Sequence, residues 1–569
     1  VQRRTGQARV PVAAIREIVP PPEGDGTGLR AYVTGGAGVE ADRSAAVKGI
    51  DETLLAITCA VLILLLLAIY RSPLVAVVPI AVVGIAYVVA GGLTYMLVRA
   101  GATEVSGQTT AILIVLMFGA GTDYCLLIVA RFRDELRRTH DVGAAMARAT
   151  ERTGPAILSA GAIVVAAMLV LVVADFNATR EMGPILALGV AVMVVAGLTL
   201  LPAILATLGR RAFWPAIPRV EPDAEPVAPL WRRIGRLVAT RPAATACILA
   251  GVLLAGALGN LGGREPLPFS EAFREPPDSV LGERVISDRF TPGRAAPLSI
   301  VTQERAADAV TNALSTGRRT PIEEMYPMAA SVPGRGTDLR LMEGYLNLEP
   351  FSDEATDTIP GLRRTARAAA AGAPVLIGGE VAEAYDTREA LGRDTRLIVP
   401  ISLGLMLVIL TALLRTVVMP LYVIATVIAS FAFALGVSSL IFTHVLDQPG
   451  SDRTLEQFAF IFLVALGVDY NVFLLARIRE ERDRGLGTRA AVIAALERTG
   501  GVITSAGLVL AATFSVLMAL PLESLFQVGF VVALGLLADT FLVRALLVPS
   551  LAVLLGERNW WPSLSRGRS

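Results

Sequence analysis

The chain of 569 residues is strongly apolar: 54% of its residues are hydrophobic, 18% are charged and the mean hydropathy is +0.61. Soluble domains carry about 25% charged residues, and here the charges are segregated between long uncharged runs, which excludes a disordered chain and an ordinary soluble enzyme. The pattern predicts a polytopic membrane protein, and a net charge of +1 gives no electrostatic basis for binding nucleic acid.

The first fifty residues are polar and predict a small folded segment outside the membrane. A helix is expected near Val10–Ile18 and a strand near Leu29–Thr34, and 1–50 is interpreted as the C-terminal remnant of a first outer domain. Superposing the two sequence repeats places Val1 opposite Gly344, so we expect about 100 further residues, including one membrane helix, to precede Val1 in the natural protein.

Eleven apolar stretches follow, each close to the roughly 20 residues that a helix needs to cross the hydrocarbon core. We therefore predict eleven membrane helices. They lie near Leu54–Tyr70, Leu74–Val98, Gln108–Val129, Ala156–Val173, Gly183–Leu208, Ala243–Leu261, Leu397–Leu414, Pro420–Phe442, Phe458–Leu475, Val502–Leu520 and Val528–Leu555.

The arginines indicate how these helices are oriented, because cytoplasmic loops carry an excess of basic residues. The arginine-rich loops are 131–152, 209–242 and 477–498, and the arginine-poor loops are 99–105, 175–182 and 521–525. We therefore expect the first group and the C-terminus to be cytoplasmic and the long polar segment 263–395 to lie outside.

The sequence contains two repeats. Glu-Arg-Thr-Gly at 151–154 recurs at 497–500, and Ser-Ala-Gly at 159–161 recurs at 505–507, both with an offset of 346 residues. Two repeats of parallel topology are a feature of transporters. The predicted division is a first outer-domain remnant at 1–50, first-half helices at 51–209, a cytoplasmic linker at 210–242, one helix at 243–262, a second outer domain at 263–395, second-half helices at 396–556 and a short cytoplasmic tail at 557–569.

The second outer segment predicts an α/β domain with the order β-α-β-β-α-β, the split ferredoxin-like pattern. The expected strands and helices, in chain order, are Leu298–Thr302, helix Arg305–Ser315, Met325–Ala330, Arg340–Leu348, helix Asp353–Ala370 and Pro374–Ile377.

Two acidic residues within the apolar stretches are the main functional candidates. Asp123 and Asp469 are 346 residues apart, and each precedes by eight residues an arginine, Arg131 or Arg477, that marks the cytoplasmic edge. Eight helical residues span about 12 Å, too far for a carboxylate to reach water, so both are expected to face the bundle interior. Low dielectric disfavours the ionised form, so such a group can take up a proton, and intramembrane charges are functional candidates by default. The alternative is a pair of inert acids that hold helices together.

A tyrosine follows each acid, at Tyr124 and Tyr470. Neighbouring residues diverge by about 100° on a helix, so each acid is expected to meet the tyrosine of the other half: Asp123 with Tyr470, and Asp469 with Tyr124. Close approach of the two helices would be permitted by three glycines, Gly119, Gly121 and Gly467.

Four further polar residues are candidates for the same machinery. Ser159 and Ser505 could extend a proton relay or could bond their own helix backbone. Asp539 and Arg544 lie in the last apolar stretch, where a structural ion pair is favoured over a second relay, and Arg544 could extend to the cytoplasmic surface.

Several kinds of chemistry find no support. Cys59, Cys125 and Cys247 show no metal-ligand spacing, and His140 and His444 are interpreted as loop residues. No Gly-Lys-Ser/Thr loop for ATP and no catalytic constellation occurs, so we predict neither an enzyme nor a metal or other cofactor.

The twinned motifs Gly121-Thr122-Asp123-Tyr124 and Gly467-Val468-Asp469-Tyr470 resemble those of the MmpL branch of the resistance–nodulation–division (RND) superfamily. The resemblance implies twelve membrane helices with two outer porter domains, of which this chain shows eleven helices and a shortened first domain. It also implies a proton relay formed by Asp123, Tyr124, Asp469 and Tyr470.

The resemblance predicts a proton-driven exporter of lipids or hydrophobic small molecules at a bacterial plasma membrane. Its expected partners are protons, the substrate and the membrane, while homo-oligomers and accessory proteins are left open. Two alternatives remain: a drug or antibiotic efflux pump, and a sterol-sensing-like regulator that binds lipid without pumping.

Overall fold

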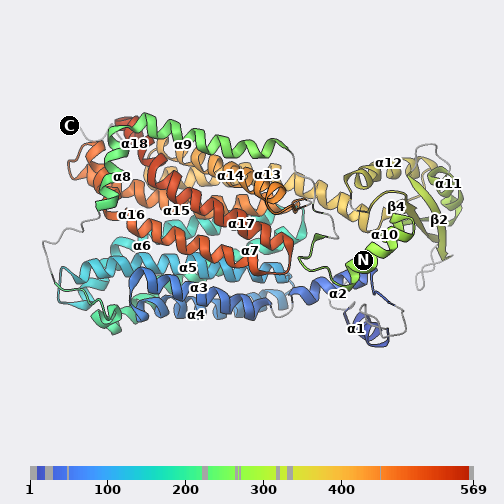
Figure 1. Cartoon of the computed structure of the whole chain (residues 1–569), viewed down its shortest axis with the longest axis horizontal. Coiled ribbons are helices and arrows are strands. Elements are labelled where there is room, and N and C mark those ends of the chain that lie inside the picture. The colour runs from blue at the N-terminus through green and yellow to red at the C-terminus, as the bar shows by residue number, and fades with distance from the viewer. Residues whose placement is uncertain are drawn as a thin grey trace.

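The computed structural model describes residues 9–19, 30–47, 50–220, 229–262, 267, 271–315, 321–329, 338–350, 352–448 and 450–562. These residues form a long helical bundle and a smaller domain beyond one end of it (Figure 1). The bundle and the outer domain each have a hydrophobic core of their own. The core of the bundle also takes in Phe273 and Val280, while the core of the smaller domain is formed by residues between Ala296 and Ala382.

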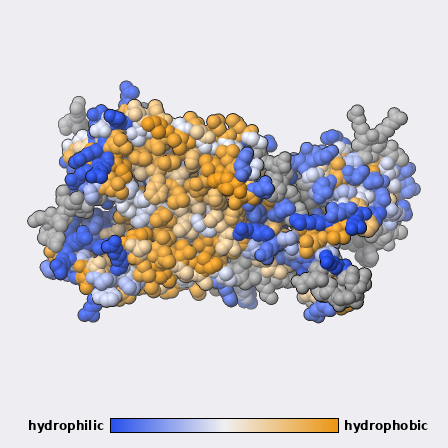
Figure 2. All heavy atoms as spheres, viewed as in Figure 1, coloured by the Kyte–Doolittle hydropathy of each residue, from blue (hydrophilic) through white to orange (hydrophobic). Residues whose placement is uncertain are grey.

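Within the described residues, eleven helices are long and apolar enough to cross a membrane, which confirms the predicted number. On the face seen in Figure 2, an apolar belt covers the bundle, and hydrophilic residues gather at its two ends. The helices are α3 (Ile50–Tyr70), α4 (Pro73–Arg99), α5 (Gly107–Leu136), α6 (Val142–Val170), α7 (Asn177–Leu208), α9 (Pro242–Ala257), α13 (Glu380–Leu414), α14 (Val418–His444), α15 (Leu455–Asp483), α16 (Thr488–Ser515) and α17 (Glu523–Ala538), the last continued by a π-helical segment (Asp539–Leu547) and α18 (Val548–Leu555). The short helix α8 (Pro229–Thr240) precedes α9.

Equivalent turns mark the two repeats in the backbone. Arg71 before α4 and Arg415 before α14 both adopt a left-handed conformation, with φ of 52° and 50°. Gly209 after α7 and Gly556 after α18 end their helices with φ of 56° and 52°. Non-glycine residues seldom take positive φ, so the paired arginines show that the halves repeat in conformation as well as in sequence.

The two helices that carry the Asp-Tyr motifs are the innermost ones. The most apolar windows of α5 and α15 are each 94% buried, whereas that of α9, at the edge, is 17% buried. Helices α16 and α7 pack against α5, and α6 and α14 pack against α15. The motifs therefore lie in the centre of the bundle, away from lipid.

The outer domain has the predicted ferredoxin-like topology. Its four antiparallel strands are ordered β2-β3-β1-β4, with α11 and α12 packed on them (Figure 1). The elements are β1 (Leu298–Gln303), α11 (Glu304–Ser315), β2 (Ile322–Ala329), β3 (Leu339–Leu346), α12 (Asp353–Ala369) and β4 (Val375–Gly378). The C-terminal end of the strand expected at Met325–Ala330 lies outside the described residues.

The N-terminal segment differs from the prediction. The helix is present as α1 (Arg9–Ile18), but residues 30–34 form no strand, and Leu29 lies outside the described residues. A strand needs a neighbouring strand for its backbone hydrogen bonds, whereas here the N–H of Val33 donates to Asp278 Oδ2 (3.0 Å) and the hydroxyl of Thr34 donates to the carbonyl of Ser279 (2.6 Å). The segment leads into α2 (Gly35–Val47), which packs against α10 (Asp278–Arg289).

Glu283 on α10 gives the outer part of the molecule a pH dependence. Burial, together with the nearby carboxylates of Glu380 and Glu349, raises the pKa of Glu283 to about 7 from 4.5. Because the pKa of Glu283 is higher in the folded than in the unfolded state, protonation of this residue favours folding. The resulting contribution to the free energy of unfolding is complete below pH 4.5 and is lost as the pH rises through about 7.

We expect Glu283→Gln to raise the thermal midpoint of the protein at pH 8 and to leave it nearly unchanged at pH 4. Purified protein in detergent, followed by circular dichroism at both pH values, measures the difference. Asp288→Asn, an exposed change on the same helix, serves as the control. Equal effects of Glu283→Gln at both pH values would contradict the prediction.

Candidate functional site

Asp123 lies deep in the bundle on α5, as predicted. Its side chain is 3% exposed, and Oδ1 has no hydrogen-bond partner among the described residues. A buried polar atom without a partner is uncommon and costs free energy. Asp123 is therefore held in an environment that disfavours its charge, which is the property expected of a group that binds and releases a proton.

Arg544 and Asp539 form a buried ion pair in the π-helical segment. Arg544 Nη2 donates to Asp539 Oδ2, and residues five apart meet on one face because the π-helix repeats its hydrogen bonds at i→i+5. On a regular α-helix the same two side chains would point about 140° apart. The predicted ion pair is confirmed, but the predicted extension of Arg544 to the surface is wrong, because the residue is 2% exposed.

Arg544 joins this ion pair to the motif helix of the second half. Its Nη2 also donates to the carbonyl of Gly467 on α15 (3.0 Å), and its guanidinium lies over the ring of Tyr470, 4.5 Å from the centroid. Arg544 is also within electrostatic range of Asp123. Arg544 is thus paired with Asp539, interacts electrostatically with Asp123 and contacts Gly467 and Tyr470 on α15.

The predicted hydrogen bond between Asp123 and Tyr470 is not formed in this conformation. The Tyr470 hydroxyl has no hydrogen-bond partner among the described residues, and the Arg544 guanidinium lies over the face of the Tyr470 ring. Tyr124 is buried and makes a polar or ring contact. The side chain of Asp469 lies outside the described residues, so its pairing with Tyr124 stays a prediction.

Ser159 and Ser505 do not extend the site here. Each hydroxyl donates to its own helix backbone, Ser159 to Ala156 (2.8 Å) and Ser505 to Val502 (2.9 Å). A hydroxyl bonded to its own helix is the structural alternative weighed for both serines.

Two of the three predicted contact glycines, Gly119 and Gly121, allow close packing, but against other helices than expected, whereas Gly467 has only ordinary van der Waals neighbours. An added Cβ at Gly119 would lie 2.9 Å from Leu510 on α16, and at Gly121 it would lie 2.7 Å from Met193 on α7. At Gly467 the nearest atom is Asp539 Oδ2, at 3.7 Å. These neighbours surround the Asp-Tyr helices, so the glycines shape the site through the helices that enclose it.

The sequence interpretation missed a pair of buried glutamates at the arginine-rich end. Glu135 binds Arg131 and Arg152, and Glu481, which is 346 residues later, binds Arg477 and Arg498. Each cluster ties an Asp-Tyr helix to the next helix of its half. The common offset and the arginine spacing were available as signals, since both glutamates repeat in register with the motifs.

Comparison with known proteins places this arrangement in a family. The MMPL family model matches residues 2–245 and 336–569. The putative membrane protein ActII-3 of Streptomyces coelicolor is 41% identical over 552 residues, which are 96% of this chain and 76% of the relative. The apo-petrobactin exporter of Bacillus anthracis is 34% identical in an alignment of 571 positions, gaps included, that covers 95% of this chain and 75% of the relative.

Two further similarities cover less of the matching proteins. The sulfolipid-1 exporter MmpL8 of Mycobacterium tuberculosis is 43% identical over 220 residues, 38% of this chain and 20% of that exporter. SecDF from Thermus thermophilus, a translocon-associated membrane protein, has the same fold with a TM-score of 0.57 and 16% identity, over 92% of this chain and 63% of SecDF, so the chain spans less than two thirds of SecDF. The resemblance of the sequence to MmpL-type transporters is confirmed, and the chain belongs to the MMPL family.

Proposed function

We propose that this protein is an exporter of lipids or hydrophobic small molecules that is driven by the proton-motive force across a bacterial plasma membrane. The arginine-rich end of the bundle and the C-terminus face the cytoplasm, and the ferredoxin-like domain lies outside. The observation that carries the proposal is Asp123, a buried carboxyl group with an unpaired oxygen beside a shared arginine at the centre of the bundle.

The chemistry of the site supports a charge exchange around Arg544. When Asp123 is ionised, Arg544 is shared between two carboxylates, and the three groups together carry a net charge of −1. When Asp123 takes a proton from the outer side, Asp539 remains as the ionised partner of Arg544. The proton then leaves Asp123 toward the arginine-rich end, and each charge moved through the field supplies about 2.3 kcal/mol per 100 mV. Asp469, Tyr124 and Tyr470 complete the relay in this proposal.

The named relatives support export of a small or lipidic molecule, but they differ in cargo. One exports apo-petrobactin and matches this chain over 95% of its length, and the other exports sulfolipid-1 and matches over 38%. Drug efflux is the alternative within transport. A lipid-binding regulator is the alternative outside it, and it predicts no substrate movement when a pH gradient is applied.

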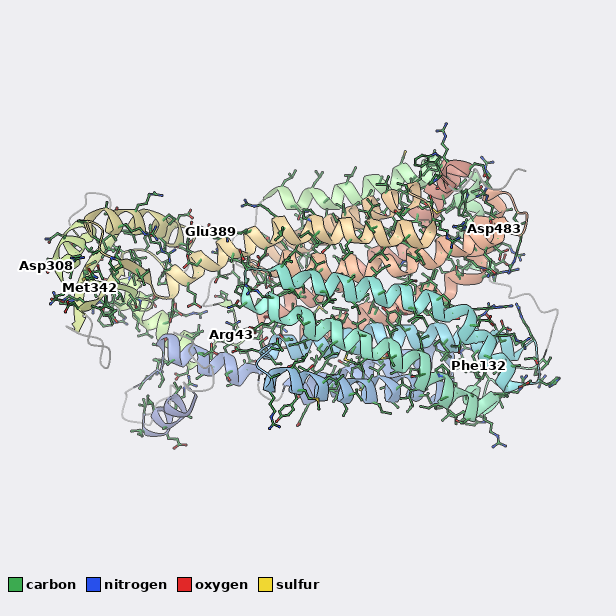
Figure 3. All side chains as sticks on the ribbon, turned by 180° about the vertical axis from the view of Figure 1, so that it is seen from behind. Arg43, Phe132, Asp308, Met342, Glu389 and Asp483 are labelled. Carbon is green, nitrogen blue, oxygen red and sulfur yellow. The ribbon has the colours of Figure 1, made fainter. Side chains whose placement is uncertain are left out.

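We expect Asp123→Asn and Asp469→Asn each to reduce proton-driven export at least about tenfold, because an amide cannot carry the proton. Proteoliposomes with a pH gradient, entrapped pyranine and fluorescently labelled phosphatidylethanolamine report proton entry and lipid movement together. Asp308→Asn, on the exposed surface of α11, is the matched control and is expected to transport normally (Figure 3). Unchanged transport in both motif variants would rule out the relay.

The buried ion pair gives a separate prediction about stability. Asp539→Asn leaves Arg544 buried without its counter-ion, so we expect a loss of about 3 kcal/mol in the free energy of unfolding. The double variant Asp539→Asn/Arg544→Gln removes both charges and is expected to recover most of that loss. Thermal unfolding in detergent compares the three proteins, and a double variant less stable than Asp539→Asn would show that the two residues do not act as a pair.

A further inference from the structure

Helix α13 connects the outer domain directly to the membrane bundle. A single residue, Gly379, separates it from β4 and takes a φ of 100°. The helix then continues for 35 residues from Glu380 to Leu414. Figure 3 labels Glu389 on this helix, between the outer domain and the bundle. The outer part of α13 and the part inside the bundle thus belong to one helix, and Asp394 lies on it between them.

Asp394, where α13 enters the bundle, holds the start of a helix from the other repeat. Its carboxylate is 1% exposed, and its two oxygens accept the backbone N–H groups of Asp175 (2.7 Å) and Phe176 (3.0 Å). These residues immediately precede α7, whose N-cap, Phe176, makes no side-chain cap of its own. Both N–H groups belong to the two residues just before α7, and Asp394 holds this segment through charge-assisted hydrogen bonds.

Helix α7 in turn packs tightly on the helix that carries Asp123. Met193 on α7 fills the space beside Gly121, two residues from Asp123, where an added Cβ would lie only 2.7 Å away. The same two helices are also close at Gly189 on α7, where an added Cβ would lie 2.5 Å from the side chain of Leu113 on α5. Rigid contacts of this kind transmit a shift of α5 to α7, because closely packed interiors do not absorb it.

We infer that Asp394 is a positioning residue that transmits the protonation state of Asp123 to the outer domain, through α5, α7 and α13. The inference rests on the proposed function, since it supplies the link between a proton site in the membrane and movement outside it. In the second repeat the start of α17 is held differently, because the N–H of Glu523 donates to the backbone carbonyl of Ala272 (3.0 Å). The side-chain link thus joins α7 of the first repeat to the outer domain of the second.

Hydrogen-exchange mass spectrometry of the full chain in lipid nanodiscs tests this without a substrate. At one fixed pH, Asp123→Asn imitates the protonated acid, and we expect it to change the exchange rates of peptides within 298–378 at least about twofold. Asp394→Asn replaces the carboxylate, which accepts two backbone N–H groups, by an amide. In this background the change in exchange rate caused by Asp123→Asn should fall to less than half. The comparison is a double-mutant cycle and measures the coupling between the two sites.

Arg393→Gln is the matched control, because Arg393 bridges to the same segment, at Asp175 (2.8 Å), through an exposed ion pair of small expected value. The control should keep the full response to Asp123→Asn. If Asp394→Asn does not yield monodisperse protein, Asp394→Glu, which keeps the carboxylate but moves it, is compared in its place and should weaken the response.

Two results would overturn the inference: an undiminished response in the Asp394 variants, or no response of the outer domain to Asp123→Asn in the otherwise unchanged chain. Neither result bears on whether a pH gradient drives export in proteoliposomes, so failure of the coupling and failure of the proposed function are distinguishable. Loss of proton-driven export with retained proton entry in Asp394→Asn would support the coupling independently.

Discussion

The central constraint on this molecule is the burial of the guanidinium of Arg544 inside the helical bundle. A buried charge requires partners, and Arg544 finds them in Asp539, the carbonyl of Gly467 and the ring of Tyr470, with Asp123 in electrostatic range. These partners come from three separate segments. The positions of α5, α15 and the π-helical segment are thus tied together by one side chain, and a change of charge on any acid must alter the position or the pairing of Arg544.

The repeat explains the architecture, but the site depends on a departure from it. The left-handed turns at Arg71 and Arg415 and the clusters around Glu135 and Glu481 are duplicated. The π-helical segment is not, since α7 continues regularly to Leu208 in the first half. One extra residue per turn turns Asp539 and Arg544 to the same face. π-Helical turns occur often at functional sites, and here the irregular turn places a cation between two otherwise equivalent halves.

Composition and spacing could predict most of the fold, because membrane helices and a β-α-β-β-α-β unit leave strong local patterns. They could also predict that Asp123 is buried, since no carboxylate twelve ångströms deep can reach water. They could not predict the surroundings of Arg544, because the inward direction of its side chain follows from a local change of helix type that hydropathy does not record. The prediction of a strand near Leu29–Thr34 failed because a strand requires a neighbouring strand as its hydrogen-bond partner. The backbone N–H of Val33 is instead bound by the side chain of Asp278, 245 residues away.

The two glutamate clusters and Asp394 constrain how the bundle can move. Glu135 and Glu481 join α5 to α6 and α15 to α16 at the arginine-rich end, through arginines on both helices of each pair. A rotation that keeps both clusters intact displaces mainly the opposite ends of these helices, where Asp394 meets the start of α7. The greatest displacement therefore falls on the end that adjoins the outer domain. A tie at that end must hold through the movement, and a buried carboxylate that accepts two backbone N–H groups meets this requirement better than an exposed ion pair, which water and salt screen.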